Sequence, residues 1–245
     1  MAKMNQRDYL LNMLDNLPED WKPHRRCTTV GQSGPPPEIE VPTPCPAEVR
    51  SILGSLLYAA RCTRPDLSFP VARVARFTDR WCEWADKELR HLLSYVSHTV
   101  DYGLIYEVGG AVDIETLRLV TYSDANFAAP FSTGGHITFL ANERGTVRLP
   151  LEWRAKRQPI SATSSGESEA LEWGAAAKTT VRWAAIVETM RMQPVAATGY
   201  VDNDAVRLAV ARGSSLALGH LGKHGEVNFR YPFAVRHFAE EGGYG

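Results

Sequence analysis

The stretch Thr116–Asp124, T-L-R-L-V-T-Y-S-D, decides the fold that we expect for this chain. Leu117, Leu119 and Thr121 recur at every second position, which is the period of a strand with at least one buried face. Asp124 falls at the end of this strand. The pattern therefore predicts a carboxylate at one edge of a sheet.

Two more strands are predicted directly downstream. Gly134-Gly135 introduces a strand over His136–Ala141, and Asn142–Gly145 has the composition of a turn. Val147–Lys156 then forms a third strand. Short connections favour antiparallel neighbours, so we expect three successive antiparallel strands.

A long helix and a fourth strand complete the predicted sheet. Ser164 and Glu167 match the Ser-x-x-Glu capping box that satisfies free backbone donors at a helix start, and the alanine-rich helix runs to about Met192. A short strand over Thr198–Asp202 again ends in a carboxylate, and a helix follows over Asp204–Ala211. The expected class is α/β, in the order strand-strand-strand-helix-strand-helix.

The sequence upstream is organised differently. Residues 1–46 combine a short amphipathic helix with a proline-rich stretch that favours extended backbone and is interpreted as a linker. Residues 47–110 are expected to form a small helical unit, and residues 111–245 the α/β domain. Helices are predicted in the small unit over 47–60, from about 67, and over 87–98.

Charge and hydropathy narrow the function classes. The chain has 27 Lys and Arg against 28 Asp and Glu, so it lacks the basic excess of a protein that coats nucleic acid. Contacts with phosphate would have to be local. Its apolar stretches are too short to span a bilayer and its N-terminus is charged where a signal peptide is apolar. We expect an intracellular protein, cytoplasmic or nuclear, without membrane contact.

Acidic side chains follow two predicted strands and begin the helix between them. They are Asp124, Asp202, and Glu167 or Glu169. Clustered carboxylates repel one another unless cations lie between them, and Mg²⁺ prefers oxygen ligands. Two such ions can activate water and stabilise the leaving oxygen in phosphodiester cleavage. Each acid alone has a plainer explanation, because an aspartate at a strand end often forms a turn with its own backbone.

Six stretches of the chain, in this order, resemble copia-type retrotransposon polyproteins. They are 50–58 (R-S-I-L-G-S-L-L-Y), 63–67 (T-R-P-D-L), 101–106 (D-Y-G-L-I-Y), 122–126 (Y-S-D-A-N), 164–170 (S-S-G-E-S-E-A) and 201–203 (V-D-N). In that family the first three belong to the connection between polymerase and nuclease. The last three carry the first, second and third metal-binding acids of RNase H.

The resemblance implies an RNase H-like mixed sheet preceded by a helical connection unit. It also implies Asp124, Glu169 and Asp202 as catalytic and metal-binding residues, with Glu167 as the alternative middle acid. The implied cofactor is Mg²⁺ or Mn²⁺ at a two-ion site, and the implied substrate is the RNA of an RNA–DNA hybrid. The polymerase portion of the same element is an implied partner.

Helix geometry separates the two candidate middle acids. Glu167 and Glu169 lie two residues apart and point about 200° apart around a helix of 3.6 residues per turn, so only one can face the metals. If Ser164 caps the helix, the capping box uses Glu167. We therefore favour Glu169, whose alternative role is that of a solvated acid stabilised by the helix dipole.

The chain departs from the family pattern in three ways. Residues 1–46 resemble only the segment after the polymerase palm, and the paired-aspartate motif of reverse transcriptases is missing. Lys223-His224 and Arg230–Phe233 resemble a family motif with two extra residues between them. The family also continues into a fifth strand and a final helix that carries a fourth carboxylate. We expect both to be missing from a chain that stops at Gly245, and nuclease activity to be impaired.

Substrate contacts are predicted more weakly. Arg154, Lys156 and Arg157 lie just before the long helix and could meet phosphates, although a solvated strand edge explains them equally well. His136 shows no metal-ligand spacing and is assigned no catalytic role. An alternative function is a non-catalytic transposon remnant, or a module kept for nucleic-acid binding or interaction.

Overall fold

The computed structural model describes residues 2–31, 43–106, 114–128, 131–142, 146–215, 221 and 233–237. The chain divides into two compact units, 2–105 and 106–245, which are described separately. Residues 32–42, which belong to the predicted linker, lie outside the described part. None of the described helices is long and apolar enough to cross a membrane.

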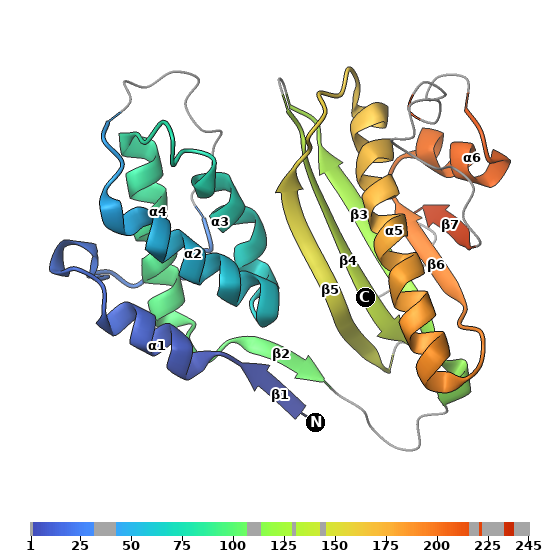
Figure 1. The fold of residues 1–245 in the computed structure, drawn as a ribbon, viewed down its shortest axis with the longest axis horizontal. Coiled ribbons are helices and arrows are strands. Elements are labelled where there is room, and N and C mark those ends of the chain that lie inside the picture. The colour runs from blue at the N-terminus through green and yellow to red at the C-terminus, as the bar shows by residue number, and fades with distance from the viewer. Residues whose placement is uncertain are drawn as a thin grey trace. The chain divides into compact units, whose positions relative to one another are not determined.

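In residues 2–31 and 43–106, the first unit contains four helices and a short two-stranded sheet (Figure 1). The helices are α1 (Arg7–Asp15), α2 (Ala47–Cys62), α3 (Ser68–Ala75) and α4 (Glu83–His98), and the paired strands are β1 (Ala2–Asn5) and β2 (Gly103–Tyr106), with 3-10 turns at Glu19–Trp21 and Pro65–Leu67. Helix α1 packs as part of this unit, because its apolar residues join the same core as those of the other helices.

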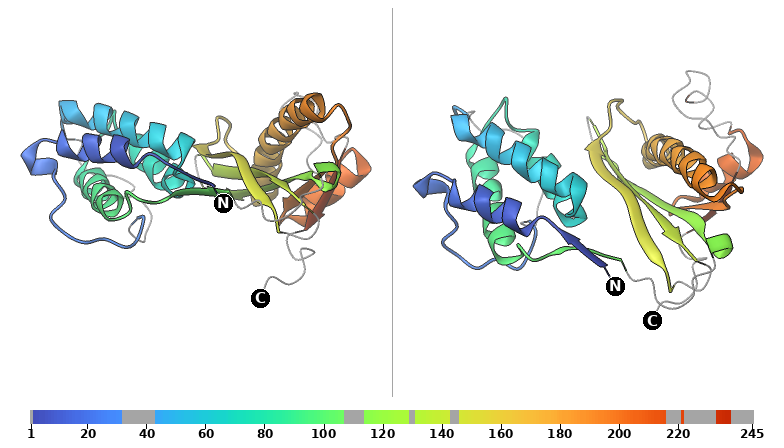
Figure 2. Two further views of the ribbon diagram at one scale, coloured as in Figure 1. Left: turned by 90° about the horizontal axis from the view of Figure 1, so that it is seen from below. Right: turned by 60° about the horizontal axis from the view of Figure 1, so that its bottom comes forward.

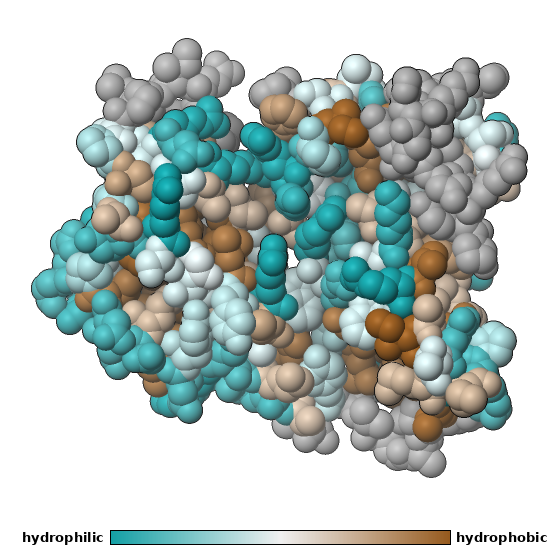
Figure 3. All heavy atoms as spheres, in the orientation of Figure 1, coloured by the Kyte–Doolittle hydropathy of each residue, from teal (hydrophilic) through white to brown (hydrophobic). Residues whose placement is uncertain are grey.

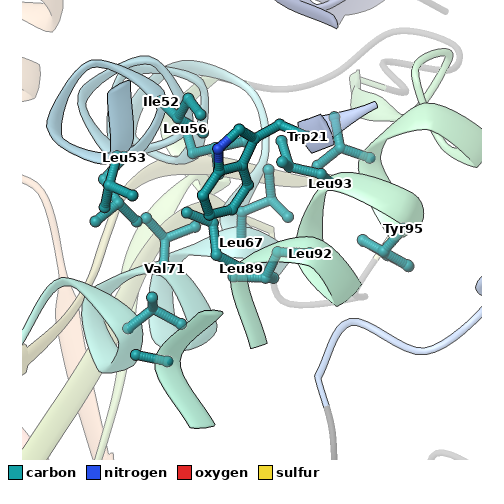
Figure 4. Packing of buried hydrophobic residues seen from close by; sticks show 14 of the residues in the cluster. Trp21, Ile52, Leu53, Leu56, Leu67, Val71, Leu89, Leu92, Leu93 and Tyr95 are labelled. Atoms are coloured by element: carbon teal, nitrogen blue, oxygen red, sulfur yellow. The ribbon is translucent and has the colours of Figure 1, made fainter. Parts of the chain in front are cut away.

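Apolar side chains from every helix of this unit meet in one core. Figure 4 shows the Trp21 indole among Leu56, Leu67 and Leu93, which come from different segments of the chain. Hydrophilic side chains predominate on the part of this unit seen at the left of Figure 3. This distribution is the amphipathic pattern that the helical periodicity predicts.

A fully buried arginine that follows α2 forms hydrogen bonds with the residue that follows α4. Arg64 donates hydrogen bonds at 2.8 Å to the carbonyl and the hydroxyl of Thr99, and it is paired with Asp66, also at 2.8 Å. The Tyr95 hydroxyl donates to Asp66 at 2.9 Å. Burial and the neighbouring Asp66 charge raise the pKa of Tyr95 to about 12. The T-R-P-D stretch therefore has a structural role in this unit.

Among its described residues, the second unit has a five-stranded mixed sheet and the helices α5 and α6 (Figures 1 and 2). Its elements are β3 (Arg118–Asn126), β4 (Thr133–Ala141), β5 (Arg148–Arg157), α5 (Ser165–Arg191), β6 (Ala197–Val201), α6 (Asp204–Arg212) and β7 (Ala234–His237), after a 3-10 turn at Ile114–Thr116. The strand order is β5-β4-β3-β6-β7. The first three strands are antiparallel, and β6 runs parallel to both β3 and β7. This is the RNase H-like sheet that the resemblance predicts.

The expectation that the fifth strand is missing is wrong. Ala234–His237 pairs in parallel with β6, from Thr198↔Ala234 to Val201↔His237. The strand has only four residues, so its period of two is too short to recognise, and it follows the stretch that resembles a different family motif. Residues 223–232 of that motif and any helix after His237 lie outside the described residues. Strand β6 is therefore paired on both sides.

The long helix α5 packs across one face of this sheet. The Thr180 hydroxyl lies 2.7 Å from the hydroxyl of Thr121 on β3, in the middle of the contact. Trp173 is fully buried, and its indole packs against Gly199 of β6. This position has no room for a side chain, because an added Cβ would lie 2.2 Å from the indole. Close contact with the sheet thus orients the helix and its first turns.

Candidate metal centre

Three segments of the second unit end at the same edge of the sheet. Strands β3 and β6 are parallel, and their last paired residues are Tyr122 and Tyr200. Asp124 and Asp202 each follow two residues later, so they lie side by side at the same edge of the sheet. Strand β5 runs in the direction of β3, and α5 begins shortly after it ends. Glu169, in the second turn of this helix, is therefore carried to the same edge.

The structure brings Asp124, Glu169 and Asp202 together. One carboxylate oxygen from each lies within 4.8 Å of the others. Asp124 and Asp202 are exposed, whereas Glu169 is only 3% exposed. The cluster thus has a buried side formed by the helix and an open side formed by the two strand ends.

The buried carboxylate of Glu169 is held by the backbone of β3. Its Oε1 atom accepts a hydrogen bond from the Ala125 N–H at 3.0 Å, while its buried Oε2 atom receives none from the described residues. Burial, helped by the charges of Asp202 and Asp124, raises the pKa of Glu169 to about 8, and the hydrogen bond from the Ala125 N–H opposes the rise. Without a cation, this carboxyl therefore retains a proton at neutral pH.

Glu167 has a different environment. The N-cap residue Ser164 accepts a hydrogen bond from the Glu167 N–H at 3.2 Å, as the capping box predicts. The Glu167 carboxylate reaches back to Thr163, where it accepts from the backbone N–H at 2.7 Å and from the hydroxyl at 2.5 Å. This acid is engaged in starting the helix, and only Glu169 joins the cluster.

The donor set suits a hard divalent cation. All three ligand groups are carboxylates, and Mg²⁺ and Mn²⁺ prefer oxygen ligands. A buried oxygen without a hydrogen-bond donor, Oε2 of Glu169, is costly unless a proton or a cation compensates for it. The residues present therefore fit a metal ion at this edge.

The weaker predicted contacts lie away from the cluster. Arg154 is paired with Glu172 at 3.3 Å, and the Arg157 guanidinium lies 4.4 Å from the ring centre of Phe131. Both line a groove beside α5, together with Lys156.

The buried pairing of Glu172 was not predicted, because its partners come from distant strands. The only local signal was a glutamate on the buried face of the helix.

Comparisons with known proteins place the chain among retrotransposon sequences. It is 36% identical over 135 residues to the retrovirus-related Pol polyprotein from transposon RE2 of Arabidopsis thaliana, covering 51% of this chain and 8% of that protein. It is 35% identical over 128 residues to the corresponding RE1 polyprotein of the same plant, with equal coverage. The chain thus spans less than a tenth of these relatives. No family model matches it.

A shorter relative is covered for most of its length. The chain is 34% identical over 123 residues to the secreted RxLR effector protein 161 of Plasmopara viticola, covering 49% of this chain and 79% of that protein. Among solved structures, LC11-RNase H1, isolated from compost, is similar at 13% identity with a TM-score of 0.36, over 51% of this chain and 86% of that one.

Sheet order, strand directions and the helix between the third and fourth strands define the second unit as an RNase H-like domain. Together with the ordered motifs and the Pol relatives, this establishes the lineage. The chain belongs to the family of copia-type retrotransposon Pol polyproteins.

Proposed function

We propose that the second unit is a metal-dependent ribonuclease that hydrolyses RNA in RNA–DNA hybrids. The single observation that carries this proposal is the convergence of Asp124, Glu169 and Asp202 within 4.8 Å at one edge of an RNase H-like sheet. The edge is open on the side of the two aspartates, so a phosphodiester can approach it. The chain carries no polymerase motif, and the polymerase portion of the same element is proposed as its natural partner.

The three acids have distinct tasks in this proposal. Divalent cations, when bound, supply activation of water and stabilisation of the leaving oxygen. Asp124 and Asp202 offer exposed oxygens to the cation on the substrate side. Glu169 offers oxygen from the buried side, and the Ala125 N–H fixes its carboxylate. Because its pKa is about 8, Glu169 would have to release its proton in order to hold a cation near neutral pH.

Cleavage of a labelled hybrid tests the proposal. The wild-type chain in Mg²⁺ should cut the RNA strand, and Asp124→Asn should reduce the rate by at least about 100-fold, since losing a metal ligand costs several kcal/mol of transition-state stabilisation. Glu167→Gln is the matched control on the same helix and should retain cleavage. A hybrid that stays intact at high protein concentration would identify a non-catalytic module instead.

A further inference from the structure

A second feature of the RNase H-like unit is a basic groove of about 410 Å³ between the edge strand β5 and α5. Strand β5 contributes Arg154, Lys156 and Arg157, and the helix contributes Lys178. All four side chains are exposed. One carboxylate, that of Glu172, also lines the groove. Cations from two elements thus converge on one concave surface, in a chain whose overall charge is close to neutral.

The carboxylate of Glu172 does not face the groove, where it would repel a bound anion. Its side chain is about 2% exposed, and its Oε1 atom accepts a hydrogen bond at 2.7 Å from Nδ1 of His136 on β4. The hydroxyl of Thr179 lies 3.3 Å from the other ring nitrogen. Gly134 makes room for the carboxylate, because an added Cβ would lie 1.9 Å from Glu172 Oε2. The carboxylate is therefore directed inward and paired.

The same carboxylate orients Arg154 toward the groove. Nη2 of Arg154 donates to both oxygens of Glu172 at 3.3 Å, and its other guanidinium nitrogens donate to none of the described residues. The side chain is 41% exposed. An arginine held at one nitrogen keeps further donors in a fixed fork, which is a geometry suited to phosphate.

We propose that this groove is a second site for the nucleic acid, holding a backbone phosphate at a distance from the carboxylate cluster. Lys178 follows Glu169 by nine residues, so it lies about 13 Å further along the helix axis. The phosphate bound here is therefore a different one from the phosphate at the cluster. The proposal depends on the proposed function for its ligand, a phosphodiester backbone.

Salt dependence of hybrid binding tests this site. Each phosphate contact adds about 0.9 to the slope of log affinity against log salt, so the affinity advantage of wild type over Lys178→Gln should shrink about threefold between 50 and 200 mM salt. Binding is measured in Ca²⁺ so that the RNA is not cut. Lys178→Arg keeps the charge and should restore the wild-type slope, and Arg212→Gln on α6 is the matched control.

Neutral methylphosphonates placed singly along each strand locate the contact. At one position away from the cleaved bond, the substitution should weaken wild-type binding more than it weakens Lys178→Gln binding, because Arg154, Lys156 and Arg157 remain in the variant. Equal slopes and equal methylphosphonate profiles for the two proteins would overturn the groove proposal while cleavage and the proposed function stand. A wild-type chain that neither binds nor cuts the hybrid would overturn both.

Discussion

Replacing Glu169 by glutamine should stabilise the metal-free chain at neutral and alkaline pH. Glutamine keeps the acceptor for the Ala125 N–H and resembles the protonated carboxyl, but it never carries the buried charge. Burial and the neighbouring aspartates raise the pKa of Glu169 from 4.5 to about 8. The substitution therefore removes one specific cost, which is that of ionising a buried carboxyl beside two others.

The direction of the pH dependence follows from proton binding. The folded state holds the Glu169 proton more tightly than the unfolded state, so its contribution to stability is fully present below pH 4.5 and is lost as pH rises toward about 8. At 1.36 kcal/mol per pKa unit, the loss between pH 5 and pH 8 is on the order of 3 kcal/mol. Glu169→Gln should lack this loss.

Urea unfolding in EDTA, followed by hydrogen exchange of the α5 amides, measures the effect. The stability difference between Glu169→Gln and wild type should grow by about 3 kcal/mol from pH 5 to pH 8. Glu48→Gln, an exposed position on α2 in the other unit, should leave α5 unchanged. If wild type and Glu169→Gln show parallel pH profiles, the account of a buried, proton-holding carboxyl is wrong.

Three further substitutions test hydrogen bonding, packing and helix capping within the units, and denaturation measures their effect on stability. Arg64→Met should destabilise the helical unit by about 1–3 kcal/mol, because the buried Thr99 carbonyl loses its donor and the partly exposed Asp66 loses its partner. Gly199→Ala should cost about 1–3 kcal/mol, since its Cβ would lie 2.2 Å from Trp173, and thermal unfolding should show a lower midpoint. Asn203→Ala should cost about 1 kcal/mol, because the Asn203 side chain caps α6 by accepting from two backbone N–H groups, and a cost near zero would contradict that role.

Much of the second unit could be predicted because its signals are local. The alternation over Thr116–Asp124 corresponds to β3, and the capping box at Ser164 begins α5 as expected. The choice of Glu169 over Glu167 also followed from local geometry, since one helix cannot direct both acids to the same place. The structure places these two residues accordingly. That the cluster binds metal stays a prediction.

The features that escaped prediction depend on pairing between distant segments. Strand β7 has only four residues, and only its pairing with β6 identifies it as a strand. Strands β1 and β2 pair although they lie at opposite ends of the first unit's sequence. The buried contact of Glu172 with His136 depends likewise on how α5 lies against β4. No residue pattern within either segment specifies these partners.

Binding of Mn²⁺ tests the central claim most directly, because the account requires that Asp124, Glu169 and Asp202 hold a divalent cation. Crystals of the chain soaked in Mn²⁺ should show an anomalous scattering peak bound by oxygens of all three carboxylates, and the peak should vanish in Asp124→Asn crystals. A well-ordered cluster without a peak at millimolar Mn²⁺, or a peak that survives Asp124→Asn unchanged, would contradict the account.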